Sequence, residues 1–239
     1  MFIFEGLEEL PMQFSHYDMS LTFQIIASLN AQTDASIEAN ISRFHSEGTE
    51  TEEYEISAED NAYHIVDYYM GLDSASVDLD EMFTSYYPSV TRRSVFLTLY
   101  GMLEHDYEKL CNGYARIHNA PIKLSDLRGS GFERCDLYAR TIIGMKTSDH
   151  YSSVKRVTKL RNACAHNDAR FFTNDGQSIA ELEVLLRTHS EVLVRDGELV
   201  NFKAGSLQRM TSILKNYFND VEKALKAHPT PDPFEALRK

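Results

Sequence analysis

The chain lacks a long apolar run and contains few cysteines. None of its 239 residues belongs to an apolar stretch that approaches the roughly 18 residues needed to span a bilayer. The three cysteines, Cys111, Cys135 and Cys164, are odd in number and far apart, which favours reduced thiols over a disulfide framework. The first residues do not place an apolar segment after a basic one, so no signal peptide is predicted. We therefore expect a cytoplasmic protein without a membrane segment.

Basic residues are almost absent from the first third of the chain. Residues 1–91 contain 18 Asp and Glu, but Arg43 is their only Lys or Arg. Residues 140–170, in contrast, hold seven basic residues and two acidic ones. The overall charge of −12 argues weakly against a nucleic-acid partner, but it conceals this local basic surface. The simpler interpretation is that both regions are solvated surfaces.

Sequence motifs typical of catalytic or metal-binding sites are absent from most of the chain. His105 and His118 fall in an expected helix, but no second ligand pair has metal-binding spacing. No G-x-S-x-G or Cys–His–Asn pattern indicates a hydrolase nucleophile, and the glycine-rich residues 128–131 lack the lysine of a phosphate-binding loop. His64 sits among apolar residues and is expected in the core. We therefore predict no metal site and no cofactor.

Apolar residues recur at helical spacing over most of the chain. This periodicity predicts helices at 15–45, 89–118, 132–145, 152–166 and 205–227. Residues 191–200 alternate around Asp196-Gly197 instead, which predicts a small β-hairpin. Most of the protein is therefore expected to be helical.

The region between the first two long helices is predicted from weaker signals. Residues 47–55 are acidic and rich in threonine, as is typical of a linker. Ser57 followed three residues later by Asp60 predicts the start of a further helix, with Ser57 as its N-cap. Residues 72–87 are expected to be irregular or to contain one short strand.

Residues 152–166 are predicted to form a basic amphipathic helix. At about 100° per residue, one face collects the apolar side chains Val154, Val157, Leu160 and Cys164. The opposite side carries a polar stripe of Lys155, Lys159, Asn162 and His166. The lysines of such a stripe attract a phosphate backbone, and a histidine titrates near neutral pH. Without a further signal, an ordinary exposed basic face is the simpler interpretation.

Arg161 lies outside this stripe, at the edge of the apolar face. A charge at that position requires an ion-pair partner or a cleft that receives a ligand. On a regular helix His166 lies about 140° around the axis from Arg161. Either the helix ends or distorts near His166, or two copies of the segment face each other in a dimer. Ala163 and Ala165 are small enough for another helix to approach closely.

The segment from Leu160 to Asn167 contains the pattern R-N-x-x-x-H, in which Arg161 is followed by Asn162 and then by His166. This pattern resembles the R-x(4–6)-H signature of HEPN domains. The resemblance implies an all-α fold, a HEPN-like helical bundle at residues 88–228 with a small β-hairpin insertion. Residues 1–87 would be an acidic N-terminal helical extension, and residues 229–239 a tail.

The resemblance also implies an activity, that of a metal-independent endoribonuclease that serves as a toxin or in antiviral defence against phage. The catalytic residues would be His166 as general acid or base, Arg161 as the group that stabilises the phosphate, and Asn162 as an orienting or phosphate-contacting residue. Lys155, Arg156 and Lys159 would contact the RNA. Asp168 replaces the tyrosine of the R-x(4)-H-x-Y toxins, so regulation through that tyrosine is not expected.

The resemblance implies partners as well: RNA, a second copy in a homodimer and a possible antitoxin or regulatory protein. One alternative is a non-catalytic HEPN-like module that binds a nucleotide or a partner protein, and a more remote one is a helical regulator. The acidic residues 1–87 are predicted either to restrain RNA access as a phosphate mimic over the basic helix of the same chain or of a neighbouring copy, or to form only a solvated surface.

Overall fold

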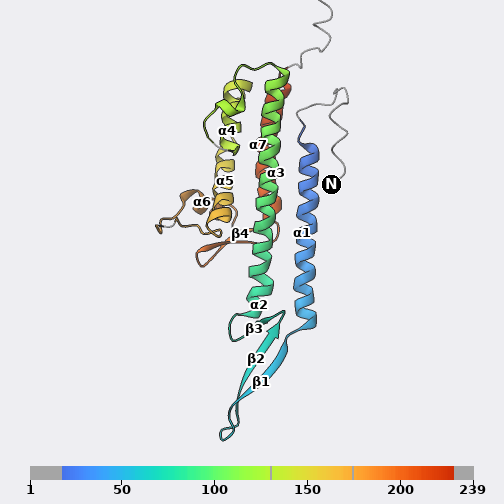
Figure 1. The fold of residues 1–239 in the computed structure, drawn as a ribbon, viewed down its shortest axis with the longest axis vertical. Helices are drawn as coiled ribbons and strands as arrows, with labels where there is room; N and C mark the ends of the chain where they lie inside the picture. Colours follow the sequence, from blue (N-terminus) through green and yellow to red (C-terminus); the bar gives the residue numbers. More distant parts are fainter. Residues whose placement is uncertain (1–17, 130, 174, 229–239) are drawn as a thin grey trace, which may run out of the picture. The chain divides into compact units, whose positions relative to one another are not determined.

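The computed structural model describes residues 18–129, 131–173 and 175–228 (Figure 1). The helices are α1 (Ser20–Glu47), α2 (Leu79–Glu81), α3 (Tyr87–Ile117), α4 (Gly131–Tyr138), α5 (Tyr151–His166), α6 (Ala180–Thr188) and α7 (Ser206–Lys226). The strands are β1 (Glu50–Ser57), β2 (Ala62–Tyr69), β3 (Leu72–Asp73), β4 (Leu193–Asp196) and β5 (Leu199–Phe202). Short helical turns follow at Met82–Tyr86, Leu124–Asp126 and Ala139–Ile143.

Two compact units divide the chain, and the long helices contribute to both. Unit 1 consists of Met1–Gln24, Gly101–Tyr151 and Leu214–Lys239, and unit 2 of Ile25–Tyr100 and Ser152–Ile213. Unit 2 therefore contains nearly all of α5 together with all five strands. Both units combine segments from either side of residue 87, and the predicted boundary between residues 1–87 and 88–228 stays a prediction.

The predicted long helices are confirmed. Helices α1, α3, α5 and α7 match the expected segments, although residues 15–17 of the first segment lie outside the described part. Helix α4 continues in a π-helical turn to Gly144, whose φ of 78° ends it as predicted. Helix α6 was not predicted, because nine residues with three buried leucines give too short a periodic pattern. No helix among the described residues is long and apolar enough to cross a membrane.

The region after α1 corrects the all-α prediction. Residues 47–55 are not a linker, and no helix begins at Ser57, because β1 and β2 form an antiparallel hairpin to which β3 adds two residues. The acidic extension at residues 1–87 is therefore not helical throughout. His64 lies on β2 and is exposed, so its expected place in the core is wrong. The protein is mostly helical and carries small antiparallel sheets.

The hydrogen bond predicted for a helix cap at Ser57 is present, but it lies in a β-turn and not at the start of a helix. The backbone N–H of Asp60 donates to Ser57 Oγ at 3.2 Å, as it would at a helix N-terminus. Here the contact closes the turn between β1 and β2, where Asn61 adopts a left-handed φ of 50°. The same side-chain bond stabilises turns as well as caps, which is why the pattern did not distinguish them.

An aromatic cluster holds the sheet against the helices of unit 2. Phe44 of α1 stacks on Phe83 with ring centroids 5.2 Å apart, and Tyr69 of β2 meets both rings edge-on. Tyr69 also donates its hydroxyl to Glu47 at 2.8 Å, a bond that raises the pKa of Tyr69. The predicted β4–β5 hairpin is confirmed, with the turn at Gly197.

The core of unit 1 contains a buried polar chain. Asp136 of α4 is fully buried and accepts from the Tyr217 hydroxyl at 2.7 Å and from Arg140 Nε at 2.8 Å. The hydroxyl of Tyr107 on α3 lies 2.8 Å from the hydroxyl of Tyr217 and can donate a hydrogen bond to it. Burial raises the pKa of both tyrosines, so both stay protonated and able to donate. This series of hydrogen bonds links α3, α4 and α7.

Replacing Tyr217 by Phe is expected to lower the free energy of unfolding by about 2 kcal/mol, because a buried carboxylate loses a donor. Tyr107→Phe should have a smaller effect, because its hydroxyl donates to an uncharged oxygen. Urea denaturation followed by circular dichroism measures both values. Equal losses in the two variants would contradict a special role for the bond to Asp136.

Candidate functional site

Helix α5 buries the face that its sequence predicts. Val154, Val157 and Leu160 are buried in the core. Cys164 is only half-buried, and Ala163 continues the buried face in its place. Burial nevertheless raises the pKa of the Cys164 thiol to about 12. The thiol is therefore protonated at neutral pH and is a poor nucleophile.

The polar stripe of α5 is exposed as predicted. Lys155, Lys159, Asn162 and His166 are all exposed, whereas Arg156 is half-buried. Burial lowers the pKa of His189, and the charges of Arg209 and Arg156 lower it further. The stripe presents two ammonium groups along one side of the helix and an imidazole at its end.

Arg161 is half-buried and is held by contacts on two sides. Its Nη1 donates to Asn162 Oδ1 at 3.0 Å. Its guanidinium carbon lies 5.4 Å from the ring centroid of Tyr100 on α3, within the range of a cation–π interaction. These contacts orient the planar face and one edge of the guanidinium group.

Tyr100 is itself fixed against α5. The side chain is buried, and its hydroxyl lies 2.8 Å from Thr158 Oγ1, one turn before Arg161. Thr158 Oγ1 also donates to the backbone oxygen of Val154 at 3.0 Å, which leaves the Tyr100 hydroxyl to donate to Thr158. The position of the Arg161 guanidinium is thus tied to α3.

Helix α5 ends at His166 in a tightly bonded turn. The backbone N–H groups of Asn167 and Ala169 both donate to the oxygen of Ala163, at 2.9 and 3.0 Å. Asp168 and Ala169 adopt left-handed φ angles of 47° and 60°. Two successive non-glycine residues in this conformation require support from their surroundings.

Arg93 of α3 supplies that support. Its Nη1 donates to the backbone oxygen of Asp168 at 2.7 Å and to Asp168 Oδ1 at 2.9 Å. The Arg93 side chain is only 10% exposed, so the ion pair is shielded on that side from water and salt. Asp168, which departs from the tyrosine of the toxin motif, therefore has a structural role in this chain.

The structure brings Arg161 and Asn162 together but keeps His166 apart from Arg161 on the helix. Helix α5 is continuous through His166, so five helical steps still separate Arg161 and His166 by about 140° around the axis. The first of the two predicted explanations was that the helix ends or distorts near His166, and it holds in part, because α5 ends at His166 but is regular up to that residue. A single α5 therefore does not aim both side chains at one phosphate along one face.

The sequence did not identify Tyr100, Thr158 or Arg93 as parts of the site. Tyr100 is only one of the regularly spaced apolar positions within the helix predicted at residues 89–118. Arg93 gave no signal beyond its charge, although a buried arginine next to the apolar face of a helix needs a partner. Only the packing of α3 against α5 brings Tyr100 and Arg93 to the motif and gives Thr158 its contact with Tyr100.

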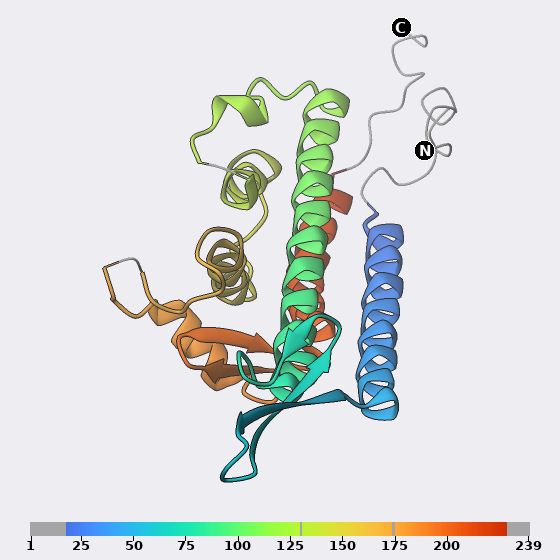
Figure 2. The same cartoon turned by 60° about the horizontal axis from the view of Figure 1, so that its bottom comes forward.

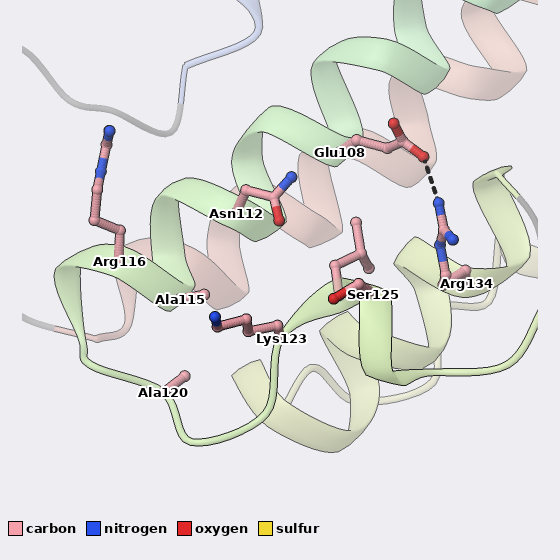
Figure 3. A pocket seen from close by; sticks show the side chains of 9 residues that line it. Glu108, Asn112, Ala115, Arg116, Ala120, Lys123, Ser125 and Arg134 are labelled. Carbon is pink, nitrogen blue, oxygen red and sulfur yellow. Dashed lines mark hydrogen bonds and ion pairs between the residues drawn. The ribbon is translucent and has the colours of Figure 1, made fainter.

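A separate cavity of about 370 Å³ lies in unit 1 (Figure 3). It is lined by Glu108, Asn112, Ala115, Arg116, Ala120, Lys123, Leu124, Ser125 and Arg134. Arg134 is neutralised by Glu108 at 2.9 Å, and Figure 3 shows Arg116 pointing away from the loop that carries Lys123. Because these charged groups do not converge, we assign no ligand to the cavity. No group of three potential metal ligands occurs within the described residues.

Replacing Arg93 by Met is expected to loosen the turn after α5, because Asp168 loses both of its bonds to that side chain. Amide hydrogen exchange should become faster at Ala169 and at Val200, whose N–H donates to the Ala169 oxygen. Arg170→Met is the matched control, because its ion pair with Glu198 is exposed and 3.9 Å long. Similar exchange in both variants would show that Arg93 does not support the turn.

Comparisons with protein-family models, curated proteins and solved structures gave no match to this chain. The likeness to HEPN domains therefore rests on the chain's own features. These are the R-N-x-x-x-H pattern at the end of a late helix and the order of the helices around it.

Proposed function

We propose that the protein is a metal-independent endoribonuclease of the HEPN type, active as a homodimer and serving as a toxin or in defence against phage. In this reaction the RNA 2′-OH attacks the adjacent phosphodiester. The 5′-oxygen of the next nucleotide leaves and takes up a proton. The products carry a 2′,3′-cyclic phosphate and a 5′-OH, and no redox partner or cofactor takes part.

The observation that carries the proposal is the restrained guanidinium of Arg161. An exposed arginine without a role has no need of a buried aromatic ring beneath it and an amide at its edge. A preorganised cation stabilises the charge that develops on a phosphate without having to reorganise during the reaction. Asn162 then acts by orienting Arg161, which was one of its two predicted roles.

The remaining roles follow from position. His166 is exposed at the end of α5 and is available as general base or general acid. Lys155 and Lys159 lie along the same exposed side and would follow the RNA backbone, as would Arg156 to a lesser degree, because it is half-buried. This arrangement favours RNA whose backbone runs along α5 toward His166.

A second copy resolves the separation of Arg161 and His166. If two α5 helices face each other, His166 of one copy can act on the phosphate that Arg161 of the other copy binds. The predicted role of Ala163 in such an interface is wrong, because Ala163 is buried within its own chain. Ala165 remains exposed and small, and it can still allow a close approach.

The alternative function is a non-catalytic HEPN-like module that binds a partner protein or a nucleotide. It is favoured by the exposed acidic hairpin of β1 and β2, which has no evident role in cleaving RNA. The two functions differ in one simple observation, the release of cleaved RNA by the purified protein.

We expect the purified protein to cleave single-stranded RNA in the presence of EDTA, because the proposed chemistry uses only Arg161 and His166. His166→Ala should lower the rate by about 100-fold or more, since general acid–base catalysis contributes that much. Gel analysis of end-labelled RNA measures the rate, and treatment with a phosphatase identifies the cyclic phosphate. Cleavage that EDTA abolishes and added metal restores would refute metal independence.

Arg161→Lys is expected to lower the cleavage rate almost as much as Arg161→Ala, by about 100-fold. Lysine keeps the charge but not the planar group that contacts Tyr100 and Asn162. Asn162→Ala should have an intermediate effect, because the cation remains but loses one orienting bond. Lys109→Ala is the control, an exposed cation of α3 in unit 1. Near-normal cleavage by Arg161→Lys would show that charge alone suffices at this position.

A further inference from the structure

The β1–β2 hairpin exposes almost its whole surface. All residues of β1 except Ser57 are exposed, and only Val66 and Tyr69 of β2 are buried. Figure 1 shows the two strands extending beyond the ends of α1 and α3 that adjoin them in unit 2. The third strand, β3, pairs only with Tyr68 and Tyr69, so most of β2 has no further neighbour.

This hairpin is strongly acidic. Residues 50–69 contain seven carboxylates and no Lys or Arg. Among the described residues these carboxylates form no ion pair, and their bonds are local, from Tyr54 to Glu52 and from Thr51 to Asp67. Like charges on neighbouring positions repel, so the isolated hairpin is destabilised by its own composition.

The hairpin also exposes large apolar side chains. Ile56 and Ile65 are 68% and 58% exposed, and Tyr54 and Tyr63 are nearly half exposed. Two-stranded hairpins without a covering layer are marginally stable, and an apolar edge strand invites association. A surface that is both acidic and apolar fits a partner with cationic side chains and aliphatic stems.

The charge pattern narrows the choice of partner. Two hairpins would repel each other, which argues against pairing of like surfaces. The exposed lysines of α5 have the opposite charge, and their long stems supply apolar contact area. Within one chain the two elements lie apart in both views (Figures 1 and 2), so the hairpin does not cover Lys155 and Lys159 of its own chain.

We propose that the hairpin of one copy docks on the Lys155–Lys159 stripe of a second copy. In a two-fold dimer the contact occurs twice, because each copy offers both surfaces. The docked hairpin occupies the track that the proposed function assigns to RNA, so RNA and the hairpin compete for it. The docked dimer is therefore the form without RNA, and it differs from the active dimer in which two α5 helices face each other. The docking itself does not depend on the proposed function, but the competition does.

Charge reversal tests the docking. Changing Glu52, Glu53 and Glu55 to Lys should weaken the dimer by about 10-fold or more, as should changing Lys155 and Lys159 to Glu. Mixing the two variants should make both hairpin–stripe contacts complementary again, one of them with its charges reversed, so a heterodimer should form where neither variant dimerises alone. Sedimentation velocity at low and high salt measures each equilibrium, and wild-type dimers should weaken as salt increases.

The matched controls reverse exposed charges elsewhere. Glu181→Lys on α6 and Lys223→Glu on α7 should leave the dimer unchanged. A monomeric wild-type protein, or a dimer that tolerates both reversals, would overturn the proposal. A dimer that persists after reversal of the hairpin alone would also overturn it, because the interface would then lie elsewhere.

Competition is measured separately. In a His166→Ala background, Gln at Glu50, Glu52, Glu53 and Glu55 should raise the affinity for a labelled single-stranded RNA by several-fold. Glu47 is left unchanged because it accepts from Tyr69. If the variant loses the dimer but its RNA affinity is unchanged, the docking proposal stands, but the claim that RNA binds the Lys155–Lys159 stripe is wrong. RNA affinity that rises without any change in the dimer would reject the docking.

Discussion

The packing of α3 against α5 is the constraint on which the candidate site depends. Two polar side chains of α3 cross into the region of the motif, Tyr100 beneath Arg161 and Arg93 beside Asp168. Both are buried, so moving either would expose an unpaired polar group to the core. The guanidinium at the start of the motif and the turn just after the motif are therefore both fixed by α3.

The sequence predicted the helices and the exposed stripe because both depend on local spacing. The helical spacing of apolar residues predicts α3, α5 and α7. The same spacing predicts that one side of α5 carries Lys155, Lys159, Asn162 and His166. It did not predict the contacts of Tyr100 and Arg93, because these residues of α3 reach the motif only through tertiary packing. The sequence of a helix predicts which of its faces is apolar, but not which neighbouring element packs against that face.

The missed hairpin has a different cause. Residues 50–69 are acidic, and five of them are Glu, a residue that disfavours strands and favours helices. The alternation of Tyr54, Ile56, Tyr63 and Ile65 indicates strands, but neither face is buried, so no apolar stripe marked the pattern. Ser57 and Asp60 then made the turn resemble a helix cap. A strand with two exposed faces carries the weakest sequence signal of any element.

The net charge of −12 conceals two surfaces of opposite charge in unit 2, the acidic β1–β2 hairpin and the basic stripe of α5. Opposite charges on one chain attract, so folding would bring them together unless another use outweighed the gain. Within unit 2 the hairpin carboxylates and the stripe lysines remain solvated at separate places. A solvated ion pair contributes little to stability, but an exposed surface of one sign accelerates the approach of a partner of the other sign. The segregation therefore favours association, with RNA or with a second copy, over stability of the single chain.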